Sequence, residues 1–471
     1  MANRYGWRPR GSFSLPHRRT SWSASGCPVE LSYFQKPSFA WRLLVIKKSG
    51  DSWARAVVFV VTLELTSSDL TTSLGPYIHW IVTALAIILL FFYGFMKSLQ
   101  PRGAPEKFTA VGFRRGFPAT VPAVLFLFAV CVPVLYGAAL TPALVGLGKL
   151  AAILLAGLLM IAARVRLALS AFYGLLWAVW INFALLLIGI LTGGPTGGMM
   201  APGRWGTVLN FPGALWRLAM TAWMYAIYLM IKRFSVRYFA LFLVSTILVF
   251  MDGARTALLI LGFGTIYLIV ILGMETGSFR KTMMTGLLGG VALVAFFGIL
   301  GSNLLQREGI IARTSDTMTS VTASGSGGLE VADYARFTML QTVLAAIQDH
   351  PVLGTGIGST TIETPVGPMV VHMTYLQIWA DLGLPGLFAY VWLVWGWLPW
   401  LPMALRRIRT LQDDQWRAIY YNAIFLLFVF GLAGLFHPLS TEWAQWLPFI
   451  VPYALLWHVV CLKPRRKEMH A

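Results

Sequence analysis

Arg255, Arg336 and His372 stand where they could handle a charged substrate. Arg255, in MDGARTALL, follows Asp252 by three residues, and Arg336 follows Asp333 by three. If each aspartate caps a helix, each arginine lies in the first turn, where a cation is unfavourable unless an anion is near. Guanidinium groups match paired phosphate oxygens, so the two sites together suggest a pyrophosphate site without metal. Alternatively, each arginine only pairs with its neighbouring aspartate.

His372, in VHMTYLQIWADLGLPG, is the candidate general base. Histidine exchanges a proton near neutral pH, as the activation of a hydroxyl requires. On a helix, Tyr375 and Trp379 would share its face at spacings of three and seven, which makes Tyr375 a candidate substrate contact. The alternative is an interfacial histidine in an aromatic belt, and His437 and His350 are competing candidates.

Lys149, Arg217 and Glu64 lie within apolar segments, where charged side chains are costly and often functional. The predicted topology places them in the outer halves of their spans, beside an outward-facing cavity. Lys149 and Arg217 are therefore candidate substrate-binding residues. The alternative is that their long side chains only reach the membrane interface.

Motifs for metal or nucleotide chemistry are absent from the sequence. It contains no HExxH, no acidic pair at metal spacing and no Walker loop, and GTGIGST at 354–360 lacks the strand and the lysine of a phosphate loop. We therefore expect neither a metal nor a cofactor.

The elements that must position these residues are membrane-spanning helices. Of the 471 residues, 57% are hydrophobic and 12% charged, and the mean hydropathy is +0.70, whereas about a quarter of a soluble domain is charged. Runs such as 81–96 and 150–163 are apolar on every side, which indicates helices rather than barrel strands. The net charge of +19 is spread over short loops, which argues for membrane topology and against a nucleic-acid partner.

The sequence predicts an all-α, polytopic protein with about twelve transmembrane helices and one large extracytoplasmic loop. Basic residues concentrate in alternate loops, so both termini are expected in the cytoplasm. The predicted segments are a disordered basic tail at 1–52, helices 1–9 in 53–302, a periplasmic loop at 303–383, helices 10–12 in 384–462 and a basic tail at 463–471. The spans are expected near 53–66, 77–97, 119–138, 142–163, 167–191, 212–232, 236–251, 254–274, 282–302, 384–404, 417–436 and 441–461.

The loop at 303–383 is too long to lack structure of its own. Apolar residues at helical spacing predict an amphipathic helix at 335–349, which ends before Pro351. A second short helix is expected at 371–382, and the Ser/Gly-rich stretch at 322–328 could be a flexible hinge.

DHPVLGTGIGS followed by VHMTYLQIWADLGLPG resembles the signature of the O-antigen ligase and polymerase superfamily. MDGARTALL resembles that family's Arg-containing span start, and Arg336 resembles the arginine that opens its amphipathic helix. The specific part of the resemblance covers about residues 250–400. Over the rest of the chain, the number of spans and the single large outer loop agree with the family. One position departs from the pattern: many members have Asn directly after the histidine, where this chain has Met373.

The resemblance implies a metal-independent glycosyltransferase of the bacterial inner membrane, active at the periplasmic face. Its donor would be a glycan on undecaprenyl diphosphate, and its acceptor lipid A-core or a second lipid-linked glycan. Arg255 and Arg336 would contact the diphosphate, and His372 would be the catalytic histidine that activates the acceptor hydroxyl. In-line attack on the anomeric carbon predicts inversion of configuration.

An O-antigen ligase acting on lipid A-core is the favoured function. A polymerase of the same superfamily, for O-antigen or exopolysaccharide, is the nearest alternative. The two enzymes differ in their acceptor, and the acceptor site is the part of the fold with the fewest recognisable sequence motifs. A transporter or flippase for lipid-linked sugars is a third. It would spread charges through the membrane depth, whereas the candidates here crowd toward one face.

Overall fold

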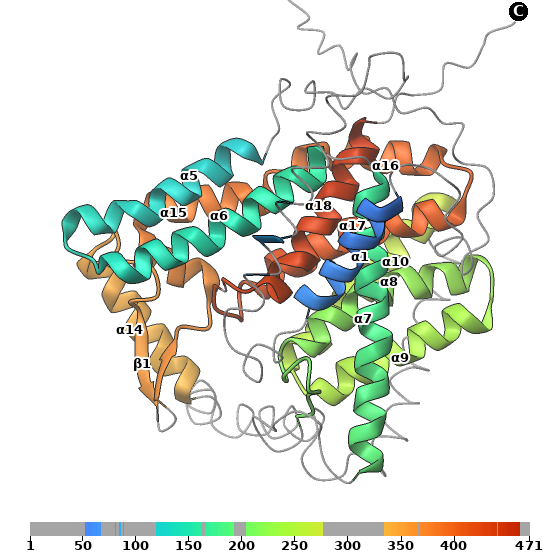
Figure 1. Ribbon diagram of the computed structural model, residues 1–471, viewed down its shortest axis with the longest axis horizontal. Helices are drawn as coiled ribbons and strands as arrows, with labels where there is room; N and C mark the ends of the chain where they lie inside the picture. Colours follow the sequence, from blue (N-terminus) through green and yellow to red (C-terminus); the bar gives the residue numbers. More distant parts are fainter. Residues whose placement is uncertain are drawn as a thin grey trace, which may run out of the picture.

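The computed structural model describes residues 52–66, 119–162, 165–192, 204–276, 334–364, 367–439 and 441–461, with isolated helical residues at 81, 84, 85 and 88. These residues are mostly helical (Figure 1). The helices are α1 (Ser52–Leu65), α5 (Thr120–Cys131), η2 (Val132–Tyr136), α6 (Leu140–Ala162), α7 (Val165–Leu191), α8 (Leu215–Lys232), α9 (Val236–Asp252), α10 (Arg255–Thr276), α14 (Tyr334–Asp349), α15 (Thr374–Trp395), η3 (Leu398–Trp400), α16 (Leu401–Thr410), α17 (Asp414–Ala433) and α18 (Trp443–Cys461).

Several predicted segments lie outside the described residues. They are the tails at 1–52 and 463–471, the spans near 77–97 and 282–302, and the stretch at 322–328, apart from Ser52 and the isolated helical residues.

Six helical segments in the described part of the chain are long and apolar enough to cross a membrane. A helix satisfies its own backbone hydrogen bonds, as a bilayer requires. The protein is therefore a helical membrane protein, as predicted, while the number of twelve spans stays a prediction. The six segments are Leu140–Ile161, Val165–Leu191, Arg255–Thr276, Thr374–Thr410, Asp414–Ala433 and Trp443–Cys461.

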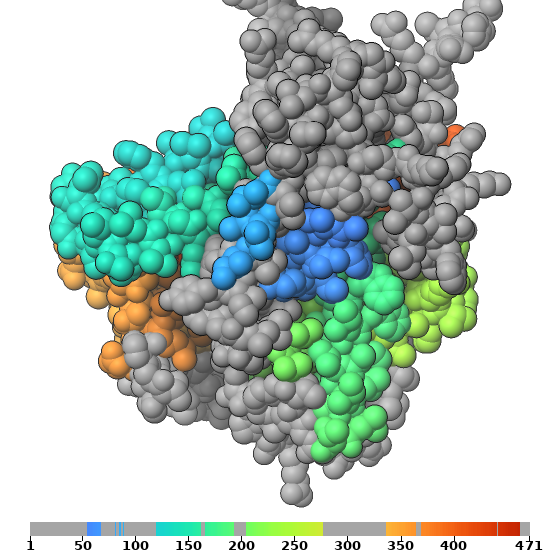
Figure 2. Space-filling view, viewed as in Figure 1, coloured from blue at the N-terminus to red at the C-terminus, as the bar shows by residue number. Residues whose placement is uncertain are grey.

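The outer surface of α5 and α6 is apolar. Figure 2 shows these helices (residues 119–162) over a wide part of one face. Val124, Phe128 and Leu144 there are 58%, 66% and 55% exposed. An apolar patch of this kind would promote aggregation in water but is favourable against lipid tails, so it is typical of a lipid-facing surface.

Helix α8 lies at the centre of the bundle, in contact with α7, α9, α10, α17 and α18. Its Trp216, Tyr225 and Tyr228 are fully buried. Because α8 has neighbours on every side, polar groups at its two ends meet side chains from several other helices.

Glu275 joins three helix ends at one end of this bundle. Its carboxylate accepts a hydrogen bond from Tyr228 (2.9 Å) and forms ion pairs with Lys232 (2.6 Å) and Arg417 (3.6 Å). The ends of α8 and α10 and the start of α17 therefore lie together. The opposite ends of these three helices carry the candidate functional residues.

Helix α15 is interrupted at Gly383, whose φ is 67°. A Cβ at this position would collide with the Val352 carbonyl, so only glycine lets the segment after α14 cross α15 so closely. The break lies between the short helix predicted at 371–382 and the span predicted from 384, so the two segments meet at a kink within α15. Helical structure then continues to Thr410, beyond the predicted end at 404.

A small antiparallel sheet, β1 (Thr361–Thr364) and β2 (Gly367–Val370), was not predicted. Ile362 packs in one cluster with Met339 and Val343 of α14. Figure 1 shows the sheet and α14 together beside α15. The sequence analysis missed these strands because each has only four residues, although the β-branched residues of β1 favour extended backbone.

Candidate active site

Asp252 caps a helix other than its own. It is the last residue of α9 and has no exposed surface. Its Oδ2 accepts hydrogen bonds from the backbone N–H groups of Gly213 (2.7 Å) and Trp216 (3.0 Å) at the start of α8. Its Oδ1 pairs with the Arg204 guanidinium at 3.3 Å.

The alternative in which Arg255 only pairs with Asp252 is therefore wrong, because this carboxylate is occupied by Arg204 and α8. Gly253, with a φ of 72°, ends α9 in the left-handed conformation. The turn directs Asp252 toward α8 and lets α10 begin at Arg255, which is half-buried.

The segment that carries His372 is hydrogen-bonded to the turn after α17. The Thr374 backbone N–H donates to the carbonyls of Gly434 and His437, both at 2.8 Å. The Thr374 hydroxyl donates to the same His437 carbonyl at 2.6 Å. These bonds hold His372, two residues before Thr374, close to the turn that carries His437.

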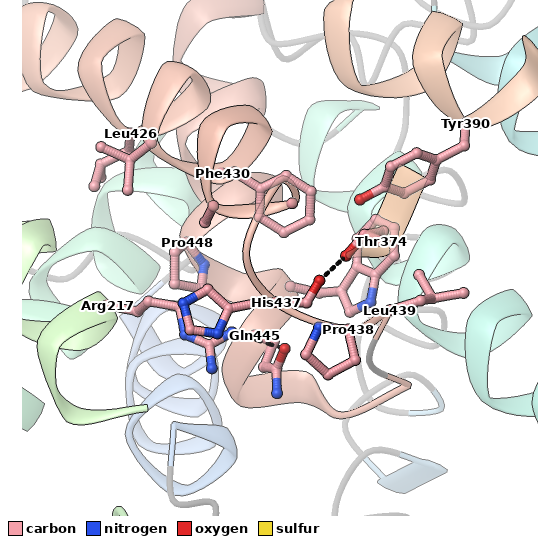
Figure 3. Close-up of a pocket in the computed structure, with 14 residues that line it drawn as sticks. Arg217, Thr374, Tyr390, Leu426, Phe430, His437, Pro438, Leu439, Gln445 and Pro448 are labelled. Atoms are coloured by element: carbon pink, nitrogen blue, oxygen red, sulfur yellow. Dashed lines mark hydrogen bonds between the residues drawn. The ribbon is translucent and has the colours of Figure 1, made fainter. Parts of the chain in front are cut away.

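A small cavity of about 40 Å³ lies beside this turn. Arg217 reaches it from α8 and donates hydrogen bonds to Gln445 Oε1 (2.7 Å) and to the Gly213 carbonyl (2.9 Å). Figure 3 shows the His437 imidazole next to Arg217 and Gln445. Aromatic and apolar side chains from α15, α17 and α18 form the other walls, among them Tyr390, Leu426, Phe430, Trp446 and Pro448.

Positive charge surrounds His437. Burial is the main cause that holds the pKa of His437 well below its ordinary value, and the charges of Arg217, His372, Arg336 and Arg204 lower the pKa further. Together with the contacts of Arg217, Thr374 and Trp216, these charges indicate that five basic side chains lie at one end of the bundle. They come from α8 and the segment before it, from α14, from the segment before α15 and from the turn after α17.

Three of the predicted site residues therefore lie near His437: Arg217, Arg336 and His372. Arg336 lies in the first turn of α14, which packs against α15. Arg255 begins α10 directly after the turn at Gly253, which follows Asp252. Asp333, the candidate cap of α14, lies outside the described residues. The functional roles of these side chains stay predictions.

Lys149 and Tyr375, the remaining two predicted substrate-binding residues, both bind other residues of the protein. Lys149 forms an ion pair with Glu442 at 3.0 Å, just before α18. The Tyr375 hydroxyl donates to the Gly431 carbonyl (2.7 Å) and accepts from Trp395 Nε1 (2.9 Å), which ties α15 to α17. Substrate contact by either residue stays a prediction.

Asp381 organises the GTGIGST segment. Its buried carboxylate accepts hydrogen bonds from the backbone N–H groups of Gly358 (2.8 Å) and Thr360 (3.1 Å) and from the Thr360 hydroxyl (2.6 Å). Gln377 Nε2 donates to it at 3.3 Å, and Gln377 Oε1 accepts from the Leu439 N–H at 2.8 Å. One side-chain network therefore connects this segment with the turn that carries His437.

Sequence reasoning did not assign roles to Arg204, Gln445, Asp381 or Gln377, and it ranked His437 below His372. Arg204 was visible only as one of the few basic residues on the predicted outer side. Asp381 and Gln377, four residues apart on one helix face, were the available signal for a polar network within an apolar helix.

Replacing Asp252 with Asn is expected to destabilise the protein by about 2–4 kcal/mol. The carboxylate uses one oxygen for the N–H groups of α8 and the other for Arg204, whereas asparagine has a single oxygen and no negative charge. The measurement is the thermal midpoint of the purified protein in detergent. Asp413→Asn is the control, since Asp413 accepts only one backbone N–H, from Gln415 at 2.7 Å. Equal midpoints for both variants would contradict the role of the Asp252 charge.

Replacing Asp381 with Ala is expected to loosen residues 354–360, because several donors would lose one shared acceptor, at a cost of about 2–4 kcal/mol. Hydrogen–deuterium exchange should rise in this segment and in the turn around Leu439. Asp349→Ala, at the exposed end of α14, is the control. Unchanged exchange in both regions of the Asp381 variant would show that the network does not hold the segment.

Comparison with known proteins supports the resemblance seen in the sequence. Residues 239–391 match the family model described as O-antigen ligase. The matched range runs from α9 to α15 and includes Arg255, Arg336 and His372. Among curated protein sequences, none matches the chain. The match confirms the similarity to the O-antigen ligase and polymerase superfamily.

Proposed function

We propose that this membrane protein, which carries an O-antigen ligase domain at residues 239–391, transfers a glycan from undecaprenyl diphosphate to an acceptor hydroxyl, with lipid A-core as the acceptor. One observation carries the proposal: basic side chains from distant parts of the chain meet at one end of the helix bundle. Contacts of Arg217, Thr374 and Trp216 bring Arg217 and His372 to the turn of His437. Arg204 is held nearby by Asp252, and the charge of Arg336 also reaches the His437 imidazole. Such a cluster suits a substrate that carries both a diphosphate and sugar hydroxyls.

The proposed reaction divides the work between arginines and an imidazole. The acceptor oxygen attacks the anomeric carbon as the bond from that carbon to the phosphate oxygen breaks, which inverts the configuration. His372 takes the proton of the attacking hydroxyl. Arg255 and Arg336 stabilise the charge on the departing diphosphate, a task that needs no metal when guanidinium groups lie in place.

The proposed topology puts this end of the bundle at the periplasmic face of the bacterial inner membrane. About twelve spans, cytoplasmic termini and a large loop at 303–383 belong to the same proposal. Its support is the basic content of alternate loops together with the cluster of Lys232, Glu275 and Arg417 at the other end, where the sequence analysis expected the cytoplasm.

The polymerase alternative shares the domain match, since the family resemblance covers both activities. In it, the acceptor would be a second lipid-linked glycan. The transporter alternative has less support, because Lys149 pairs with Glu442 near Gln445 and Arg217, so these groups gather at one end rather than along a path.

A transfer assay tests the proposal. The full chain, purified in detergent, is incubated with a lipid-linked oligosaccharide and either lipid A-core or more lipid-linked glycan, in the presence of a metal chelator and without nucleotide. Product on lipid A-core supports the ligase, and a lengthened lipid-linked glycan supports the polymerase instead. No product with intact donor binding would contradict both and favour transport.

A further inference from the structure

His437 has no role in the proposed reaction and belongs to none of the sequence motifs. It lies in the turn between α17 and α18 and lines the cavity described above. Its Nε2 is shielded from solvent and makes no hydrogen bond to any described residue. A buried polar atom without a partner is costly, so a partner supplied by a ligand would remove that cost.

The ring of His437 is held in place by groups other than Nε2. The fully buried Trp216 ring packs against it, with the ring centroids 5.7 Å apart. The His437 carbonyl accepts both the N–H and the hydroxyl of Thr374. The imidazole is therefore positioned by its surroundings before any ligand arrives.

The charge around His437 selects the kind of ligand. Burial lowers the pKa of His437 well below its ordinary value, and the charges of Arg217, His372, Arg336 and Arg204 lower it further, which favours the neutral imidazole. A neutral imidazole nitrogen bonds well with a hydroxyl, which can both donate and accept. An anionic phosphate would instead be drawn to the neighbouring guanidinium groups.

Gln445 offers the complementary half of a hydroxyl site. Its Oε1 accepts a hydrogen bond from the Arg217 guanidinium at 2.7 Å. A guanidinium has no acceptor, so the oxygen of the amide, and not its nitrogen, must face Arg217. The NH₂ group of the same amide must then point away from Arg217, and it donates to no described residue. A hydroxyl between Gln445 and His437 could bond to both, and a cavity of about 40 Å³ has room for a group of that size.

We propose that His437 Nε2, with Gln445, binds a sugar hydroxyl of a substrate glycan in this cavity. Tyr390 and Trp446, which line the same cavity, are buried, so the cavity admits a hydroxyl rather than a whole sugar ring. This inference rests on the proposed glycosyl transfer. The hydroxyl could belong to the acceptor or to the donor glycan, and the experiment distinguishes the two.

The test is His437→Phe, which keeps the ring volume and the packing against Trp216 but removes both nitrogens. We expect the KM of one glycan substrate to rise about tenfold, the loss that one hydrogen bond explains, while the thermal midpoint and the KM of the other substrate stay unchanged. His437→Gln, which keeps an N–H or carbonyl near Nε2, should recover part of the loss. His458→Phe is the control, because His458 lies in the last turn of α18, outside this cavity, and its Nε2 is also buried without a hydrogen bond to any described residue.

Each result has a definite meaning. A higher KM for the acceptor alone assigns the hydroxyl to the acceptor, and a higher KM for the donor alone assigns it to the donor glycan. Unchanged KM values in a stable, active variant overturn the inference, as does weaker inhibition by inorganic diphosphate, which would make His437 a phosphate contact. If the wild-type protein transfers no glycan, it is the proposed function that fails.

Discussion

His372→Ala is expected to lower the rate of glycan transfer by about 10²- to 10⁴-fold, the range that a positioned general base contributes. Alanine removes the imidazole but leaves the hydrogen bonds that fix Thr374, two residues later, to the turn of His437. The variant should therefore fold and bind the lipid-linked donor normally. Single-turnover rates and donor binding, measured on the same preparation, separate these effects.

The histidine His350 provides a matched control, because it is exposed at the end of α14. His350→Ala should transfer glycan at the wild-type rate. Wild-type activity of the His372 variant would remove this residue as the base. A loss of donor binding in that variant would instead make His372 a donor contact.

Arg255→Lys and Arg336→Lys are each expected to reduce the transfer rate about 10- to 100-fold, because lysine keeps the charge but loses the planar fork that binds two phosphate oxygens at once. The effect should fall mainly on kcat, since charge on the diphosphate grows as the anomeric bond breaks. Steady-state kinetics with varied donor concentration measure the division between kcat and KM.

Arg237→Lys is the control for these two substitutions, because Arg237 is exposed near the start of α9, at the other end of that helix from Asp252. It should leave both kinetic constants unchanged. Full activity of Arg255→Lys and Arg336→Lys would mean that any cation suffices at these positions, and a rise in KM alone would point to ground-state binding only.

The organisation of the site also explains why a short turn between two apolar helices can matter for function. Gln377 connects Asp381 to the backbone of Leu439, and Thr374 connects the start of α15 to His437. The turn after α17 is thus fixed from two points on α15. A change in the GTGIGST segment can reach the His437 turn through these hydrogen bonds.

Much of the fold followed from the sequence because its signals are local. Long apolar runs predicted the helices, and α6, α7 and α18 begin and end within a few residues of the predicted bounds. Helical spacing predicted α14 at 335–349, and it spans Tyr334–Asp349. The motifs around Arg255, Arg336 and His372 indicated the family, which the domain match supports.

Only the tertiary structure decided which polar groups meet. Arg204 and Arg217 are far from His437 and Gln445 in the chain, and each alone looks like an ordinary interfacial residue. The partner of Asp252 depended on the backbone turn at Gly253, and the passage of one segment across α15 depended on the conformation of Gly383. Hydrophobicity and periodicity describe one helix at a time, whereas contacts between helices depend on how those helices pack together.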